Sequence, residues 1–141
     1  MSFDLYSEIL QEFDLAPTRK EKIEVLQRHD TVRFRQFLEY AFNPEIEFDV
    51  NIPEYKPSMS PAGLNDAYLD GQLAKMYRFI KNHPQRAANF GGIQQERILL
   101  LILESLHKDE AQLMCRMIQK NLSIKYLTPN LIREAYPGIN L

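Results

Sequence analysis

The spacing of apolar residues along the chain predicts seven short helices. In each predicted helix the apolar side chains recur every three or four positions, which gathers them on one face of a helix. Polar stretches, prolines and glycines separate these segments. The predicted helices cover residues of about 3–13, 18–29, 31–42, 65–81, 93–106, 109–121 and 128–136.

Local signals mark several helix ends. Thr18 begins a capping-box pattern at the second helix, and Asp30 is expected to cap the third. Thr128 followed by Pro129 is the start signal of the last helix, because proline fits the first helical position. The third helix must end before Pro44, since the residue that precedes a proline is pushed out of the helical region.

Two of the predicted helices have distinctive residues, one a long apolar run and the other an internal glycine. The six consecutive apolar residues from Ile98 to Leu103 make that helix apolar on nearly all sides, so we expect it to be central. Gly71 lies inside the predicted helix at 65–81 and weakens it by roughly 1 kcal/mol relative to alanine.

One stretch, residues 45–52, has the period of an extended chain instead of a helix. Its apolar positions alternate with Glu45, Glu47, Asp49 and Asn51, which is typical of a half-buried strand. An isolated strand is not stable, so we expect it to lie across the helices; the alternative is that it pairs with the edge of another chain. The alternating apolar residues are Ile46, Phe48, Val50 and Ile52.

The residues that follow, 53–63, are expected to form a loop and to be the best hinge candidate. Pro53, Pro57, Pro61 and Gly63 fall within this short stretch, and proline and glycine are the strongest interruptions of regular structure. Length agrees with a single domain over residues 1–141. The fold class predicted is therefore all-α, a compact bundle of about seven short helices with one extended segment.

Composition excludes several classes of protein. Hydrophobic residues make up 45% of the chain and charged residues 26%, which is ordinary for a globular protein and excludes wholesale disorder. Cys115 is the only cysteine, so no intrachain disulfide forms and a reducing compartment is expected. No apolar run approaches about 18 residues, and the start of the chain is acidic, so neither a membrane span nor a signal peptide is predicted.

The sequence shows no constellation of catalytic or metal-binding residues. His29, His83 and His107 are scattered at predicted helix ends without a partner at a metal-ligand spacing. Cys115 lies on a predicted helix beside Arg116, where a small core residue is a better interpretation than a nucleophile. No phosphate-binding loop, dinucleotide fingerprint or nucleophile elbow is present. We therefore expect no enzyme activity, no cofactor, no metal and no small-molecule substrate.

Charge is distributed unevenly along the chain. Residues 1–63 carry 7 Lys+Arg against 12 Asp+Glu, whereas residues 64–141 carry 10 against 7. Near the end, Arg116, Lys120, Lys125 and Arg133 are opposed by few acids. Such asymmetry can mark an acidic or nucleic-acid partner. A solvated helix face is the preferred interpretation, since net charge argues for solubility and not for a fold or a partner.

Five segments together carry a family resemblance. In their order along the chain, they resemble a family of small uncharacterised proteins of T-even-like tailed phages, including phages of marine cyanobacteria. The resemblance implies a protein that acts in the cytoplasm of the host cell, with the virion as the alternative location. The segments are Thr18–Leu26, Phe37–Pro44, Ile52–Pro57, Leu101–Ala111 and Leu127–Gly138.

The same layout is similar, more distantly, to the N-terminal helical DNA-binding domain of phage ATP-dependent DNA ligases. In that domain a basic helix leads through a turn into a final helix that ends in an aromatic-Pro-Gly tripeptide. Here these features are the helix with Arg116 and Lys120, the turn at 123–126, and the tripeptide 136–138. The turn holds Lys125-Tyr126 where the ligases usually have a glycine, and the nucleotidyltransferase motif Lys-x-Asp-Gly is absent. The resemblance implies a DNA-recognition module without the enzyme.

Three functions follow from these observations. The first is a non-catalytic phage accessory protein that binds DNA or docks on the replication or transcription machinery. The second is a factor that binds and modulates a host or phage protein through its acidic half or through Ile46, Phe48, Val50 and Ile52. The third is a structural protein of the virion. The residues expected to contact DNA are Arg116, Lys120, Lys125, Tyr126 and Arg133.

Overall fold

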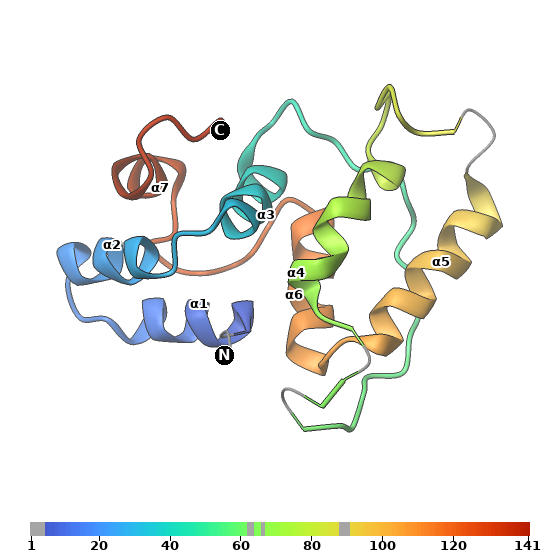
Figure 1. The fold of residues 1–141 in the computed structure, drawn as a ribbon, viewed down its shortest axis with the longest axis horizontal. Coiled ribbons are helices and arrows are strands. Elements are labelled where there is room, and N and C mark those ends of the chain that lie inside the picture. Colours follow the sequence, from blue (N-terminus) through green and yellow to red (C-terminus); the bar gives the residue numbers. More distant parts are fainter. Residues whose placement is uncertain (1–4, 62–63, 66, 88–90) are drawn as a thin grey trace.

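The protein is all-α, as the sequence predicts (Figure 1). The computed structural model describes residues 5–61, 64–65, 67–87 and 91–141. Within these ranges there are seven α-helices and one 3-10 helix, and no strand of a sheet. The elements are α1 (Tyr6–Leu15), α2 (Arg19–Arg28), α3 (Val32–Phe42), α4 (Leu69–Gln72), η1 (Leu73–Phe79), α5 (Gly92–Ser105), α6 (Lys108–Ile118) and α7 (Pro129–Ala135).

The helix at the centre of the packing is α6. It contacts α1 and α3 on one side and α4 and α5 on the other, and thereby joins the two ends of the molecule. Its apolar residues Leu113, Met114 and Met117 are buried, and they belong to one core that also holds Tyr6 near the start of the chain and Tyr136 near its end. Side chains from distant parts of the sequence therefore meet around this helix.

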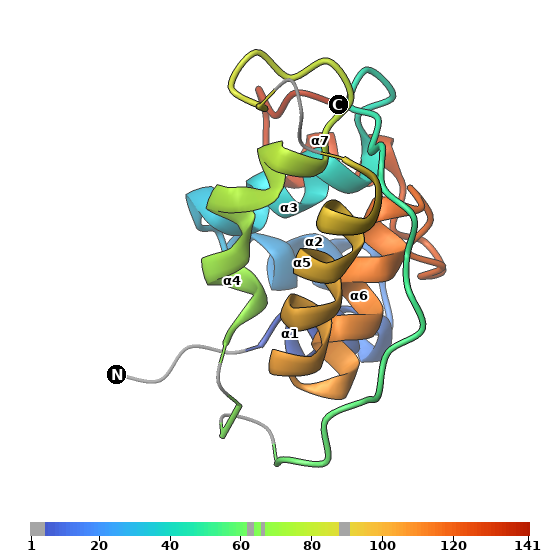
Figure 2. The same cartoon turned by 90° about the vertical axis from the view of Figure 1, so that its right-hand side faces the viewer.

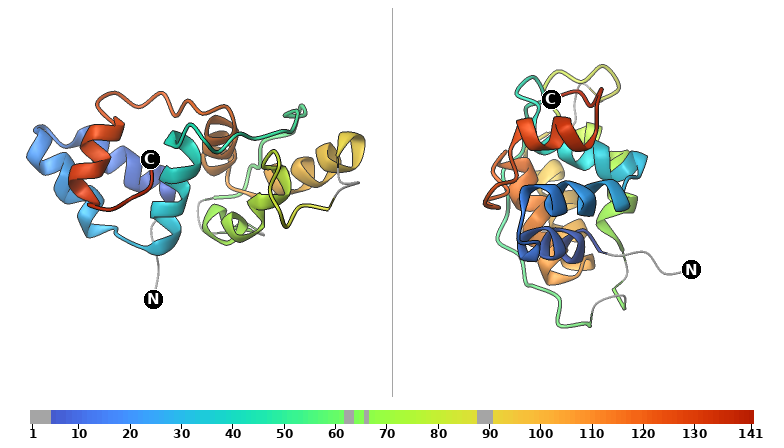
Figure 3. Two further views of the ribbon diagram at one scale, coloured as in Figure 1. Left: turned by 90° about the horizontal axis from the view of Figure 1, so that it is seen from above. Right: turned by 90° about the vertical axis from the view of Figure 1, so that its left-hand side faces the viewer.

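The prediction that the helix with the six-residue apolar run is central was wrong. That helix is α5, and it lies at the edge of the molecule, at the opposite end from α2 (Figures 1 and 3). Leu99 and Leu103 are fully buried, but the side chain of Leu101 is 69% exposed. Helix α5 contacts α6 as its main helical neighbour, and the side of the apolar run that holds Leu101 is left exposed.

The predicted helix at 65–81 is shorter and more tightly wound than expected. It begins at Leu69 as α4 and continues from Leu73 to Phe79 as the 3-10 helix η1. A 3-10 helix has three residues per turn, so side chains three apart lie on one face. Leu73, Met76 and Phe79 have this spacing and are all fully buried. Packing of this period-three stripe favours the tighter winding.

Most of the predicted helix ends are confirmed. The hydroxyl oxygens of Thr18 and Thr128 accept hydrogen bonds from backbone N–H groups three residues later, at 3.2 and 3.3 Å. The cap of α3 is Thr31 and not Asp30, since the Thr31 hydroxyl accepts from the N–H of Phe34 at 3.1 Å. Asp30 instead pairs with the guanidinium of Arg35. The first helix begins at Tyr6 and not at about residue 3 as predicted, since Leu5 is extended and forms its N-cap; residues 1–4 lie outside the described residues.

Residues 45–58 form an extended segment, which we call the strap. Its apolar side chains are half-buried against the core, while the charged residues between them are exposed, so the predicted alternation is confirmed. The backbone of the strap pairs briefly with the chain after η1, through N–H of Asp49 to O of Phe79 (2.7 Å) and N–H of Lys81 to O of Glu47 (2.8 Å). It then follows α5 and reaches the start of α6 (Figure 2).

The predicted loop at 53–63 has no helix between residues 53 and 61, and residues 62–63 lie outside the described residues. Its first part is tied to the corner between α5 and α6. The N–H of Lys56 donates to the Glu104 carboxylate at 3.0 Å. The backbone of Ser58 forms an isolated parallel β-bridge with that of His107. Its role as a hinge stays a prediction.

Candidate functional site: a groove between α1 and α2

The position of α1 is fixed by a buried carboxylate at its N-terminus. Glu110, on α6, is only 2% exposed, and its carboxylate accepts hydrogen bonds from the N–H groups of Tyr6 (2.9 Å) and Ser7 (2.7 Å). A negative charge is favourable at this end of a helix, where N–H groups lack partners within the helix. Burial raises the pKa of Glu110, and the hydrogen bonds from Ser7 and Tyr6 oppose this rise.

A buried ammonium group fixes the other end of α1. Lys22, on α2, is 7% exposed, and its Nζ donates to the carbonyl oxygens of Phe13 (2.9 Å) and Asp14 (3.3 Å). The same Nζ lies 5.0 Å from the centroid of the Phe13 ring, a cation–π distance. A cation suits the C-terminal end of a helix, where carbonyl groups lack partners. Lys22 therefore sets how α1 and α2 sit against each other.

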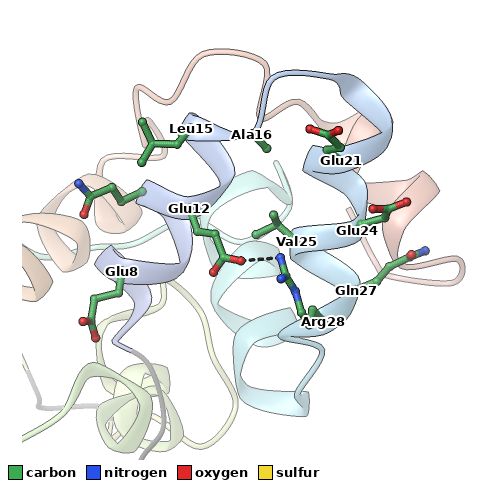
Figure 4. A pocket seen from close by; sticks show the side chains of 10 residues that line it. Glu8, Glu12, Leu15, Ala16, Glu21, Glu24, Val25, Gln27 and Arg28 are labelled. Atoms are coloured by element: carbon green, nitrogen blue, oxygen red, sulfur yellow. Dashed lines mark hydrogen bonds and ion pairs between the residues drawn. The ribbon is translucent and has the colours of Figure 1, made fainter.

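Between these two helices runs a groove of about 940 Å³ (Figure 4). Helices α1 and α2 are joined by residues 16–18 and run in opposite directions (Figure 1). Val25 is buried at the base of the groove, Ala16 is half-buried at the connection, and Leu15 at one end is 74% exposed. The groove thus has an apolar strip along part of its length.

Carboxylates dominate the walls of the groove. Glu8 and Glu12 come from α1 and Glu21 and Glu24 from α2, against one cation, Arg28. Arg28 pairs with Glu12, as Figure 4 shows. In the described part of the chain, no cation lies within ion-pair distance of Glu21 or Glu24. The groove is therefore a negatively charged channel with carboxylates free to pair with another molecule.

Lys120, a predicted DNA contact, has a structural role instead. Its Nζ donates to the carbonyl oxygens of Tyr40 and of Asn43, the latter at 2.7 Å, at the C-terminal end of α3. It also lies 5.9 Å from the centroid of the Phe48 ring, beneath the strap. Burial lowers the pKa of Lys120 to about 8. An ammonium held in this way is not available to a phosphate group.

Arg116, on α6, is also partly engaged; α6 ends at Ile118 and not at about residue 121 as predicted, so Lys120 lies in the turn that follows. Its side chain is half-buried, and its Nη1 donates to the carbonyl oxygen of Leu122 at 3.4 Å. This bond lies at the start of the turn between α6 and α7. Arg116 on α6 and Lys120 just after it, the two cations that the ligase resemblance places on a basic helix, are therefore directed toward the protein itself.

The other three predicted DNA contacts lie on the surface. Tyr126 is 59% exposed, and the Nζ of Lys125 lies 5.1 Å from the centroid of its ring. The Nζ of buried Lys22 lies 5.6 Å from the same ring. Arg133 is exposed on α7, where its Nη1 donates to the side chain of Asn130 at 3.0 Å. The structure thus separates the five residues into two that hold the fold and three that are accessible.

The strap residues that were predicted to bind a partner protein pack against the core of their own chain. Ile46, Phe48, Val50 and Ile52 are half-buried and pack against the core. The Phe48 ring makes an edge-to-face contact with Tyr40, with ring centroids 5.7 Å apart. These side chains are therefore used within the protein, and the alternative that they pair with another chain receives no support from their positions.

The surroundings of Cys115 and His107 indicate structural roles for both residues. Cys115 is half-buried against the core, and burial raises the pKa of its thiol, which is the opposite of an activated nucleophile. His107 caps α6, since its Nδ1 accepts from the N–H of Asp109 at 3.1 Å. Among the described residues, no group of three or more potential ligands is placed to hold a metal ion.

The groove was not predicted from the sequence, although a signal was present. Glu8 and Glu12 are four residues apart and Glu21 and Glu24 three apart, so each pair shares a helix face. The short connection between the two predicted helices makes them antiparallel neighbours. Together these facts indicate that the two acidic faces lie side by side, but they do not show that the faces enclose a groove.

A comparison with curated proteins finds no match, and a comparison with solved structures finds none. In the part of the chain that the structure describes, no helix has the length and apolarity needed to cross a membrane. The sequence model of a family of unknown function, DUF6433, matches residues 9–124, which is most of the chain, and the protein therefore belongs to that family.

Proposed function

We propose that this protein is a non-catalytic docking module that binds a basic, amphipathic helix of a protein partner in the groove between α1 and α2. The observation that carries the proposal is the groove itself, which combines four carboxylates with an apolar strip. A host or phage protein is the partner that the phage resemblance suggests. We favour this protein-binding role over the DNA-recognition module that the ligase resemblance implies.

The charges of the groove support a basic occupant. Glu21 and Glu24 have no cationic partner in the described residues, and Arg28 is already paired with Glu12. A partner with Lys or Arg at matching positions gains these carboxylates without breaking an existing ion pair. Charge complementarity of this kind raises association rates and selects partners more than it adds affinity.

The shape of the groove supports a helical occupant. Two antiparallel helices leave a channel in which a third helix can lie, and amphipathic helices commonly bind by placing their apolar face in such a groove. The exposed side chain of Leu15 and the buried one of Val25 supply the apolar contact. A helix with apolar residues on one face and basic residues at its flanks fits both features.

A peptide-binding experiment tests the proposal. The probes are a labelled amphipathic helix of leucine and lysine and a matched helix of leucine and glutamate, measured by fluorescence anisotropy at two salt concentrations. We expect the basic peptide to bind, the acidic peptide not to bind, and the double variant Glu21→Lys, Glu24→Lys to lose at least tenfold in affinity. The control variant Glu45→Lys, Glu54→Lys changes the net charge equally outside the groove and should bind as the wild type does.

A pull-down identifies the natural partner. The bait is the full chain, in extracts of infected host cells, because the sequence resembles proteins of T-even-like phages. A partner that the wild type and the control variant retain, but the groove variant loses, supports the proposal. In the peptide experiment, equal binding by the wild type, the groove variant and the control variant argues against binding in the groove. Loss of peptide binding in the control variant as well argues against it too.

DNA binding is the second candidate, and the geometry of Tyr126 favours it. Its φ of 70° lies in the left-handed region, which costs a non-glycine residue roughly 1 kcal/mol or more. The backbone nevertheless holds the aromatic ring at the surface beside the Lys125 ammonium. An exposed ring next to a cation is suited to stacking on an unpaired base and to contact with a phosphate.

The test is binding to nicked, duplex and single-stranded DNA at two salt concentrations. Lys125→Glu with Arg133→Glu should abolish salt-sensitive binding if this surface contacts DNA. Both residues are exposed, so the variant should fold, unlike one that changes Lys120. Absence of binding at low salt would exclude the DNA hypothesis and leave the docking module.

A further inference from the structure

The outer face of α5 exposes large apolar side chains. Ile93 is 70% exposed and Leu101 is 69% exposed, and they are eight residues apart, which puts them on one side of the helix. Leu100 and Ile98 flank this face and are half-buried. Scattered apolar residues are normal on a protein surface, but several on one helix face mark an interaction site more often.

The covering of α5 explains why this face is left open. The helix packs against α6, and the strap runs beside it, where Gln95 donates to the carbonyl oxygen of Asp49 at 2.7 Å. No described element lies on the other side, at the edge of the molecule (Figures 1 and 2). The six-residue apolar run indicates a helix buried on nearly all sides, and a single copy of the chain covers only part of it.

The charges on the exposed face are self-complementary. Arg97 and Glu104 lie seven residues apart, or about 10 Å along the axis at 1.5 Å per residue, on the same exposed side as Leu101. When two identical helices pair antiparallel about a two-fold axis between residues 100 and 101, residue 97 of each copy lies opposite residue 104 of the other. The same operation places Leu100 opposite Leu101. Leu100 and Leu101 then meet at the centre with opposite charges on both sides of them, while Ile93 of each copy lies opposite residue 108 of the other, beyond the end of α5.

We propose that two copies of this chain form a two-fold dimer through the outer faces of α5, antiparallel, with Arg97 of each copy paired to Glu104 of the other. The Glu104 carboxylate already accepts from the N–H of Lys56 at 3.0 Å, which restrains its position, and a carboxylate has room for further donors. A two-fold arrangement is the commonest form of homodimer, because one surface then serves both partners.

The size of the face sets the expected strength of the dimer. Helix α5 has 14 residues and is therefore roughly 21 Å long. In the proposed pairing only residues 96–105 of the two copies face each other, roughly 15 Å of helix, and a face of this length buries less than the roughly 800 Å² per partner of a standard interface. The dimer is accordingly weak, and its population depends on protein concentration.

Light scattering on the full chain at increasing concentration tests the proposal. We expect the mass to rise from that of one chain, 16.6 kDa, toward twice that value. Leu101→Glu should keep the protein monomeric over the same range. Val32→Glu is the matched control, because Val32 is 83% exposed on α3, and it should dimerise as the wild type does.

A charge exchange tests the antiparallel geometry. Arg97→Glu alone and Glu104→Arg alone should each weaken the dimer at least tenfold, because like charges then face each other. The double variant should restore dimerisation, since the pairs are re-formed with opposite signs. A wild-type protein that stays monomeric at every concentration overturns the proposal. A dimer that resists Leu101→Glu, or a double variant that is not restored, overturns it as well.

Discussion

Replacing Lys22 by methionine isolates the bond that holds α1 against α2. The methionine keeps most of the side-chain volume but removes the two hydrogen bonds from Nζ to the carbonyl oxygens of Phe13 and Asp14. Hydrogen bonds from charged groups contribute about 1.5–3 kcal/mol each, and removing the buried charge also removes its cost of desolvation, so we expect a net loss of about 2–3 kcal/mol in unfolding free energy. With an unfolding entropy of about 2.1 cal/mol/K per residue, this lowers Tm by roughly 7–10 °C.

The assay is thermal and chemical unfolding followed by circular dichroism, with amide hydrogen exchange as a local readout. The N–H of Ala16, which donates to the carbonyl oxygens of Glu12 and Phe13, should exchange faster in the variant because the end of α1 frays. Lys20→Met is the control: Lys20 is exposed on the same helix, and its loss should change stability by less than about 0.5 kcal/mol. A Lys22→Met protein as stable as the control would refute the role given to this ammonium.

Further predictions concern titration and backbone conformation. The pKa of Lys120 is lowered to about 8, so its side-chain NMR resonances should shift with a midpoint near that pH. Because an unfolded lysine titrates at a higher pH, the wild type should gain stability relative to Lys120→Met as the pH rises above about 8. A difference in unfolding free energy between the two proteins that does not change with pH would contradict this. Lys120→Glu should lower Tm by removing the hydrogen bonds that the Lys120 ammonium donates to carbonyl oxygens at the C-terminal end of α3, whereas Lys125→Glu, at an exposed position, should leave Tm nearly unchanged. Gly71→Ala should stabilise the protein by about 0.5–1 kcal/mol, since Gly71 is helical and an added Cβ meets nothing within 4 Å. Gly138→Ala should destabilise it by about 1 kcal/mol in the same unfolding assay, because its φ of 91° strains any other residue although the space is open.

Local chemistry, which the sequence expresses directly, determined the elements. Thr18, Thr128 and Pro129 mark helix starts because a side-chain oxygen and a fixed φ act within one turn. The alternation through Phe48 and Val50 predicted an extended segment on the helices, because a period of two puts one side of the segment on the core. The class of the fold follows from such periods alone.

Tertiary structure decided what lies next to what. A run of apolar residues is the same in a central helix and in an edge helix, so the exposure of Leu101 depended on where α6 and the strap lie. Lys120 and Lys125 are both lysines near one turn. Only Lys120 is hydrogen-bonded to the end of α3, which is nearly 80 residues away in sequence. The groove between α1 and α2 likewise depends on Glu110 and Lys22, which hold the two ends of α1. Burial and long-range hydrogen bonds act between segments that are distant along the chain, and only the packed fold brings those segments together.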